Sequence, residues 1–334
     1  MTVAGETTEA TPDLLFQIAS GFMAAKHLFV ANEVGLFAHL ADGPATLDEL
    51  ARRTGIAGRR LRILADAMVV LGVLERTDGQ YRNGPVAATF LSGTGPADLR
   101  PFLRFWDRLS YPTWTKFEAA VRTGQGQSTL HLPEDEQRIF SEGVEAIQAA
   151  PARTLPTVYD FSRHRRVLDI GGGTGSWLSA ILASYPSLQA TLFELPAAAA
   201  VARQHLAGHP ATRQVEVVAG DFFADPLPDG HDAVLIANVV HLLSPEHNLE
   251  LLRRTRDAVP AGARLLLVDF WTDQTHTQPP FAALMAGEFL VITGEGDVYS
   301  TEEVSGWLGT TGWRPIEHQP VAGPISVMVA EAAE

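Results

Sequence analysis

The residues of this chain that are best suited to chemistry begin with a glycine-rich segment. Val167–Gly175 reads V-L-D-I-G-G-G-T-G, so apolar residues and one acid, Asp169, lead into a run of glycine. Glycine permits a positive φ and lets a ligand touch the main chain where a Cβ would clash. Ser176 stands where a dinucleotide fingerprint has its third glycine, and no Gly-Lys-Ser/Thr ending follows. The segment therefore predicts a binding turn that is neither a dinucleotide site nor a phosphate-binding loop.

Two acids follow at the ends of the next apolar runs. Glu194 closes the run Thr191–Phe193, where a carboxylate can accept hydrogen bonds from both hydroxyls of a ribose and disfavours a 2′-phosphate. Asp221 follows the run Val215–Val218, and it can accept from an adenine amino group while Phe222 lies against the ring face. These residues and the glycine turn predict a nucleoside site without a phosphate grip.

The elements that must position these residues alternate along the second half of the chain. Apolar runs separated by helical or loop segments occur at Val167–Ile170, Thr191–Phe193, Val215–Val218, Ala233–Ala237 and Leu265–Phe270. This alternation predicts an α/β fold with a Rossmann-like, doubly wound parallel sheet, whose ligands lie at the carboxyl ends of the strands. Trp313–Pro320 and Ser326–Ala330 are expected to close the sheet as an antiparallel hairpin.

The amino-terminal third has a helical pattern instead. Apolar residues recur at three-and-four spacing over Asp13–Leu40, and Thr46–Glu49 reads T-L-D-E, the signature of a capping box. Two short amphipathic helices joined near Gly55 and a hairpin over Val73–Arg82 follow. Helix, turn, helix and hairpin together predict a winged-helix domain.

A winged helix raises the question of DNA binding. Arg59, Arg60 and Arg62 lie on its second helix, but the chain has 25 basic and 39 acidic residues, a net charge of −14. An acidic chain repels a phosphate backbone, so we expect no nucleic-acid partner and instead a domain that packs on a second copy. A winged-helix regulator that senses a ligand is the alternative from another functional class.

Composition bounds the remaining possibilities. The absence of cysteine excludes disulfides, thiolate metal sites and cysteine nucleophiles, and the scattered histidines predict no metal site. The start of the chain lacks the pattern of a signal peptide, and no apolar stretch is judged long enough to span a membrane, so a cytoplasmic protein is expected. The expected segments are a disordered tail at 1–11, a winged-helix dimerisation domain at 12–98, a helical linker at 99–156 and a Rossmann-like catalytic domain at 157–334, with a hinge at Pro151–Pro156.

Taken together, the motifs resemble those of the class I S-adenosylmethionine-dependent methyltransferases. Residues 14 to 332 resemble the small-molecule O-methyltransferases of the plant caffeate type and their bacterial natural-product relatives. That family's V-D-V/I-G-G-G-T-G, D-L-P and G-D-M/F-F motifs correspond to Val167–Gly175, Glu194–Pro196 and Gly220–Phe223. The resemblance implies S-adenosylmethionine as cofactor, S-adenosylhomocysteine as its product, a homodimer and an aromatic small-molecule acceptor from secondary metabolism. The cofactor-binding residues expected on this basis are Asp169, Gly171, Gly173, Gly175, Glu194, Gly220, Asp221, Phe222 and Asn238.

The resemblance also implies catalytic residues. His241 follows the fourth strand, where the family has its general base, and an imidazole can take a phenolic proton near neutral pH. Asp269, 28 residues further on, matches an acid that orients this base. The family's second acid falls on Val298, next to Asp297, and Leu242–Leu243 replace its Asp-Trp. These departures leave open whether Asp297 assists, and leave C- or N-methylation as the alternative to O-methylation.

Aromatic residues on helical segments are candidates for the acceptor pocket. The middle of the chain is rich in rings, and a second set recurs at four-residue spacing after Asp269. Because such spacing suits a packed core equally well, each residue has that alternative. The predicted pocket residues are Phe105, Trp106, Tyr111, Phe140, Phe281, Met285 and Phe289.

Overall fold

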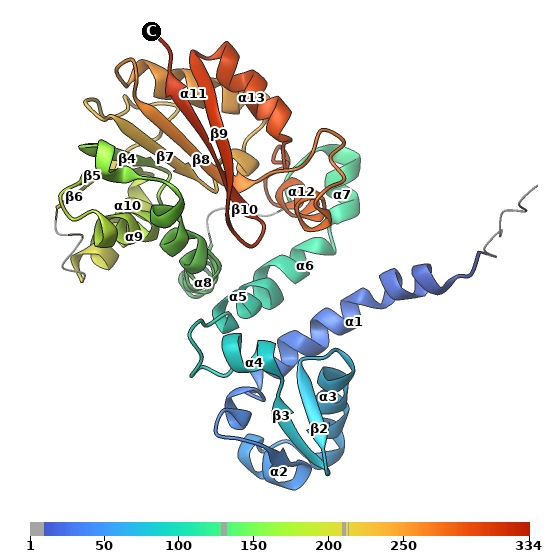
Figure 1. Cartoon of the computed structure of the whole chain (residues 1–334). Helices are drawn as coiled ribbons and strands as arrows, with labels where there is room; N and C mark the ends of the chain where they lie inside the picture. Colours follow the sequence, from blue (N-terminus) through green and yellow to red (C-terminus); the bar gives the residue numbers. More distant parts are fainter. Residues whose placement is uncertain (1–9, 128–131, 209–211, 213) are drawn as a thin grey trace, which may run out of the picture. The chain divides into compact units, whose positions relative to one another are not determined.

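A computed structural model describes residues 10–127, 132–208, 212 and 214–334 (Figure 1). The chain divides into two compact units, residues 1–108 and 109–334. The predicted tail at 1–11 lies almost entirely outside the described residues.

The first unit is mostly helical. Its elements are α1 (Asp13–Glu33), η1 (Ala38–Leu40), β1 (Ala45–Thr46), α2 (Leu47–Thr54), α3 (Gly58–Val70), β2 (Leu74–Thr77), β3 (Gln80–Asn83), α4 (Pro85–Phe90) and α5 (Arg100–Phe105). The strands form an antiparallel sheet in the order β1-β3-β2. The capping box at the start of α2 is confirmed, because Thr46 Oγ1 accepts from the Glu49 N–H and Glu49 accepts from the Thr46 N–H. The order of helices and hairpin agrees with the predicted winged helix.

Helix α1 corrects one expectation from the sequence. This helix of 21 residues is long and apolar enough, by length and composition alone, to cross a membrane. The expectation that no apolar stretch of the chain reaches that length is therefore wrong. Two of its three charged residues, Asp13 and Glu33, lie at its ends, and Lys26 is the charged residue between them, which keeps the segment apolar on average. The apolar side chains that one copy of the chain leaves exposed on α1 include Leu14, Leu15, Phe16, Ile18, Phe22 and Met23.

The second unit is built on a seven-stranded sheet in the order β6-β5-β4-β7-β8-β10-β9. Its strands are β4 (Arg166–Ile170), β5 (Gln189–Glu194), β6 (Val215–Ala219), β7 (Ala233–Ala237), β8 (Arg264–Phe270), β9 (Trp313–Ala322) and β10 (Ile325–Ala332). The first five are parallel, and β10 pairs antiparallel with both β8 and β9, so the predicted closing hairpin is confirmed. The predicted fold class is likewise confirmed.

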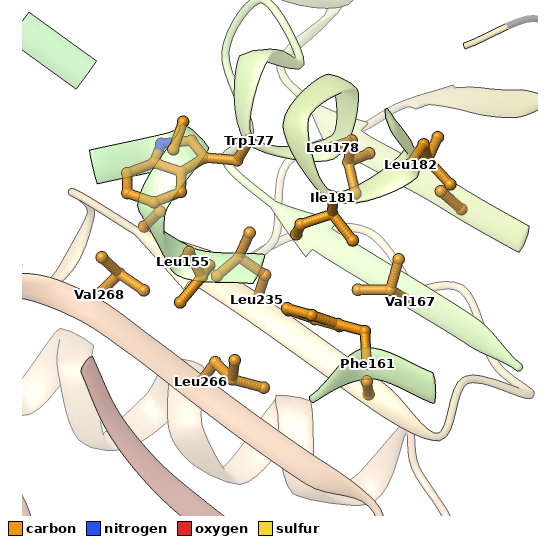
Figure 2. Close-up of a cluster of buried hydrophobic side chains, with 14 of the residues drawn as sticks. Leu155, Phe161, Val167, Trp177, Leu178, Ile181, Leu182, Leu235, Leu266 and Val268 are labelled. Carbon is orange, nitrogen blue, oxygen red and sulfur yellow. The ribbon is translucent and has the colours of Figure 1, made fainter. Parts of the chain in front are cut away.

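Side-chain alternation along the strands supplies two cores, one on each face of the sheet. Val167, Leu235 and Leu266 point into a cluster with α8 (Glu134–Val158), α9 (Ser176–Ser184) and α10 (Pro196–Ala207), part of which Figure 2 shows. Their neighbours Leu168 and Ile236 point into the other cluster, with α11 (Pro245–Asp257) and α13 (Thr301–Thr310). Both faces are covered, which is why these strands read as continuous apolar runs. The other helices that the structure describes in this unit are α6 (Tyr111–Trp114), α7 (Phe117–Thr123), η3 (Phe161–Arg163), η5 (Val240–Leu242) and α12 (Pro280–Thr293), and a π-helical turn, η2 (Trp106–Ser110), precedes α6.

The hinge predicted at Pro151–Pro156 is wrong. Helix α8 runs through both prolines, which are buried. Each proline removes only one helical hydrogen bond, and Leu155 between them is fully buried in the core against α9 and the sheet. Packing therefore outweighs the local preference of proline for breaking a helix.

Candidate active site

The glycine turn joins β4 to α9 with an unusual backbone. Gly171, Gly173 and Gly175 have φ values of 71°, 56° and 86°, a region that side chains with a Cβ rarely adopt. Space is also limited, because a Cβ on Gly175 would come within 2.8 Å of the Leu206 side chain. The turn thus needs glycine both for its conformation and for packing against α10.

Asp169 lies beneath this turn and is fully buried. Neither of its carboxylate oxygens has a hydrogen-bond partner among the described residues. Burial, and secondly the charge of Glu194, raise the pKa of Asp169 to about 8. A Cβ on Gly172 would come within 2.6 Å of the Asp169 carboxyl carbon, so the turn fits closely over the acid. An unpaired buried carboxylate is costly, and a ligand with a cationic or hydrogen-donating group would satisfy it.

Glu194 is connected to the same turn. Its Oε2 accepts a hydrogen bond of 3.0 Å from the Gly173 N–H, and its Oε1 accepts one of 2.7 Å from the Leu195 N–H. Each carboxylate oxygen has a second lone pair, which leaves capacity for two ligand hydroxyls.

Asp221 and Phe222 follow β6, at the next strand end. Asp221 Oδ1 accepts from the Phe223 N–H at 2.8 Å, which fixes the turn, and the ring of Phe222 meets that of Phe223 edge-on at 4.7 Å. Gly220 is buried, and a Cβ there would come within 2.5 Å of the Phe193 ring. Asp221 and Phe222 are both half-buried.

The sheet order explains why these segments meet. Because β6, β5, β4 and β7 are neighbours and parallel, their carboxyl ends lie along one edge, which carries Asp221, Glu194, the glycine turn and Asn238 in that order. Asn238 has a φ of 57°, and its N–H donates to the Val268 carbonyl at 2.8 Å. The sequence motifs are thereby brought together at one edge.

One residue at this edge was missed by the sequence analysis. Glu145 on α8 accepts a 2.9 Å hydrogen bond from Thr174 Oγ1 and a second from Ser176 Oγ. It lies outside every motif, and only the packing of α8 against α9 brings it to the turn. The serine that replaces the third glycine therefore has a structural partner.

His241 and Asp269 form a buried pair near the ends of β7 and β8. His241 Nδ1 lies 2.5 Å from Asp269 Oδ1, and the His241 main-chain N–H donates to Asp269 Oδ2 at 3.3 Å. The two residues are 6% and 1% exposed. When Nδ1–H donates to the carboxylate, Nε2 keeps its lone pair, so the arrangement can accept a proton at Nε2.

Helix α12 brings two of the predicted pocket residues to this pair. The Phe289 ring stacks on the His241 ring, with centroids 3.7 Å apart and planes at 18°. Met285, one turn earlier, packs in the same small cluster as Phe289. Phe281, at the start of the helix, is 42% exposed and lies 6.0 Å from the Phe270 ring.

The segment that replaces the family's second acid supports His241 through its backbone. The Asp297 N–H donates to the His241 carbonyl at 3.1 Å, and a Cβ on Gly296 would come within 2.5 Å of that carbonyl oxygen. Asp297 Oδ1 accepts from the Val298 N–H at 2.7 Å, and burial raises the pKa of Asp297. Val298 is fully buried. The side-chain bond that the structure gives Asp297 is thus local.

The other predicted pocket residues are divided between the units. Phe105 and Trp106 belong to the first unit, and Tyr111 and Phe140 to the second, on α6 and α8. All four are half-buried, and their role in a pocket stays a prediction. Among the described residues, no group of three or more His, Cys, Asp and Glu could hold a metal ion.

The fold and this edge define a class. A parallel sheet with a reversed strand at β10, a glycine turn after β4, and acids after β5 and β6 are the architecture of a class I methyltransferase. Two family models match the chain: an O-methyltransferase domain at residues 114–314 and an O-methyltransferase dimerisation domain at 16–93. The chain belongs to the O-methyltransferase family and is an S-adenosylmethionine-dependent enzyme.

Relatives and solved structures agree with this assignment. The 3-hydroxy-5-methyl-1-naphthoate 3-O-methyltransferase of Streptomyces sahachiroi is 35% identical, covering 94% of this chain and 92% of the relative. The tetracenomycin polyketide synthesis 8-O-methyl transferase of Streptomyces glaucescens is 28% identical, covering 95% and 96%. The crystal structure of human N-acetylserotonin methyltransferase in complex with S-adenosylmethionine superposes with a TM-score of 0.87 at 26% identity, covering 99% and 100%.

Proposed function

We propose that this enzyme transfers the methyl group of S-adenosylmethionine to a hydroxyl of an aromatic, polyketide-type small molecule in antibiotic biosynthesis, with His241 as general base. The observation that carries the proposal is the buried His241–Asp269 pair, whose Nδ1···Oδ1 distance is 2.5 Å. It lies next to the strand edge that carries the nucleoside-binding motifs.

The residues at the strand edge suit the cofactor. Glu194 offers oxygens to the two ribose hydroxyls, and Asp221 with Phe222 offers an acceptor and a ring face to the adenine. Asp169, beneath the turn, has no hydrogen-bond partner in the part of the chain that the structure describes, which fits a ligand with an ammonium group. The main-chain groups of Gly171, Gly173, Gly175 and Gly220 and the side chain of Asn238 complete the proposed cofactor site. The cofactor supplies an electrophilic methyl group on a sulfonium.

His241 then acts on the acceptor. Nε2 would take the hydroxyl proton as the acceptor oxygen accepts the methyl group that the cofactor would supply, so the proton ends on the imidazole and S-adenosylhomocysteine is the product left in the cofactor site. Asp269 stabilises the resulting imidazolium through Nδ1. The Phe289 ring, stacked at 3.7 Å, orients the imidazole and can favour its cation. Tyr111, Phe140, Phe281 and Met285, which all belong to the second unit, are proposed to line the acceptor pocket with Phe289.

Two relatives support the acceptor class. One is by name a methyltransferase of a hydroxynaphthoate, and the other is an 8-O-methyl transferase of tetracenomycin polyketide synthesis. The aromatic side chains near His241 are suited to a flat ring of that kind.

We also propose a cytoplasmic homodimer. The dimerisation domain begins within α1, and the exposed apolar side chains of that helix would be covered by a second copy. A dimer interface on α1 would explain why this helix is apolar without requiring that it enter a membrane. We propose no nucleic-acid partner.

His241→Asn tests the base assignment. We expect kcat to fall about 10²- to 10⁴-fold, the usual contribution of general base catalysis. S-adenosylhomocysteine affinity, measured by calorimetry, should stay unchanged because the cofactor residues are untouched. A near-full rate with normal cofactor binding would mean that positioning alone suffices. Incubation with labelled S-adenosylmethionine and NMR mapping of the methyl group would identify C- or N-methylation, which the apolar Val298 at the second acid position leaves as the alternative.

A further inference from the structure

Helix α12 contains a single acid, Glu288, in an otherwise apolar sequence, P-F-A-A-L-M-A-G-E-F-L-V-I-T. Its side chain is 5% exposed. It directly precedes Phe289, whose ring stacks on His241. Neither the sequence motifs nor the proposed chemistry uses this residue.

The surroundings of Glu288 fix its carboxylate. Oε2 accepts a 2.8 Å hydrogen bond from Ser110 Oγ and another from Trp114 Nε1. The Trp114 indole packs against the same helix, because a Cβ on Gly287 would come within 2.9 Å of it, and the Phe117 ring lies 4.8 Å from the indole. Two donors on one oxygen therefore hold the carboxylate in a single orientation among aromatic rings.

The second oxygen is the unusual feature. Oε1 is shielded from solvent and has no hydrogen-bond partner among the described residues. Burial raises the pKa of Glu288, as expected for an acid in apolar surroundings. A buried polar atom without a partner is costly, and a core position on an apolar helix would be filled more favourably by a hydrocarbon side chain. The acid therefore calls for a role beyond packing.

The position of Glu288 on the helix indicates that role. Met285 lies three residues earlier, on the neighbouring part of the helix surface, and Phe289 follows. Both are proposed acceptor-pocket residues. The unpartnered carboxylate oxygen thus belongs to the stretch of α12 that contacts the catalytic histidine.

We propose that Glu288 determines which acceptors the enzyme takes. Its Oε1 accepts a hydrogen bond from an N–H or O–H group that the aromatic acceptor carries in addition to the methylated hydroxyl. An acceptor with a carboxylate at that place is disfavoured, because two like charges would meet in an apolar site. This inference rests on the proposed function, and it separates this enzyme from a methyltransferase whose acceptor is a naphthoate.

A matched pair of acceptors tests the proposal. A hydroxynaphthamide and the hydroxynaphthoate with the same ring and hydroxyl position differ only in an amide that donates and a carboxylate that cannot. We expect the wild-type enzyme, loaded with S-adenosylhomocysteine, to bind the amide at least about 10-fold more tightly, the effect of one hydrogen bond to a charged group. Preference of the wild type for the carboxylate would overturn the proposal without any variant.

Glu288→Gln is the informative substitution. Glutamine keeps an oxygen for Ser110 and Trp114 and replaces Oε1 by an NH₂ donor, so the polarity at that point is reversed. We expect the amide-to-carboxylate affinity ratio to fall by about 10- to 100-fold, for the loss of one contact and the removal of one repulsion. Glu302→Gln, an exposed acid on α13, is the control and should leave the ratio unchanged. An equal ratio in the wild type and Glu288→Gln would refute the assignment.

Binding and turnover separate this inference from the proposed function. Acceptor binding to the S-adenosylhomocysteine complex requires no methyl transfer and no proton transfer to His241. Discrimination that depends on Glu288, with no methylation of either hydroxyl, would support the role of Glu288 and contradict the proposed reaction. Methylation of both acceptors at rates that are the same in the wild type and in Glu288→Gln would support the proposed reaction and contradict the role of Glu288.

Discussion

Asp269→Asn is the substitution that most directly examines the proposed base. In the native carboxylate, Oδ1 lies 2.5 Å from His241 Nδ1 and also accepts a hydrogen bond of 2.8 Å from the Phe270 N–H. Oδ2 accepts one of 3.3 Å from the main-chain N–H of His241. Asparagine has the same shape but no charge. If its amide NH₂ faces Nδ1, that nitrogen must become the acceptor, and the proton moves to Nε2, where it blocks base catalysis.

The size of the effect follows from the burial of the pair. Removing one partner of a buried ionic pair costs about 3–5 kcal/mol, and each 1.36 kcal/mol is a factor of ten in rate, so kcat should fall about 10²- to 10⁴-fold. The imidazolium forms only as the proton moves, so the loss should appear in kcat and leave cofactor affinity unchanged. This range agrees with the whole contribution expected of a general base.

The assay is the pH dependence of kcat with a phenolic acceptor, beside Asp257→Asn, an exposed acid at the end of α11, as the matched control. A phenol ionises without help as the pH approaches about 10, so the deficit of Asp269→Asn should shrink as the pH rises. A kcat close to wild type at neutral pH, or a deficit that stays constant at every pH, would refute the reasoning.

Two further predictions concern the acid beneath the glycine turn. Gly172→Ala would place a methyl group within 2.6 Å of the Asp169 carboxyl carbon. We therefore expect the free energy of unfolding to fall by about 1–3 kcal/mol and calorimetry to show weaker S-adenosylhomocysteine binding. The control is Gly306→Ala, whose methyl group would have no neighbour within 4 Å and which should be neutral or stabilising. Burial raises the pKa of Asp169 to about 8, so the native chain holds this proton more tightly than the unfolded chain. The stability that this group contributes is therefore complete below about pH 4 and is lost as the pH rises through about 8. Asparagine does not titrate, so the melting temperature of ligand-free Asp169→Asn should rise relative to that of the wild type over this interval. A difference in melting temperature that stays constant with pH would contradict the prediction.

The sheet could be predicted from the sequence because its information is local. The parallel strands are short, mostly apolar runs, and three of them, β4, β5 and β6, lead into glycine or end in an acid. The motifs at Gly171, Glu194 and Asp221 then fall at neighbouring strand ends as a consequence of the topology. The capping box at Thr46 could be predicted for the same reason, because both of its hydrogen bonds lie within four residues.

The features that the sequence concealed depend on packing between distant segments. Pro151 and Pro156 suggest a break locally, but burial against α9 and the sheet keeps α8 continuous. Glu145 reaches the glycine turn only through that same contact. Glu288 is one acid in an apolar helix, and its partners lie more than 170 residues earlier in the chain.

Val298, at the position predicted for the family's second acid, bears on how the proposed active site works. Val298 is fully buried, and the neighbouring residues support His241 through main-chain contacts: the Asp297 N–H donates to its carbonyl and Gly296 allows the close approach. In the part of the chain that the structure describes, Asp269 is the carboxylate bonded to the imidazole. Asp269 is then expected to supply the negative charge that stabilises His241 when its imidazole is protonated. In an arrangement with two acids, the loss of one would be partly offset by the other, so the large, pH-dependent deficit predicted for Asp269→Asn is itself a test of whether Asp297 assists.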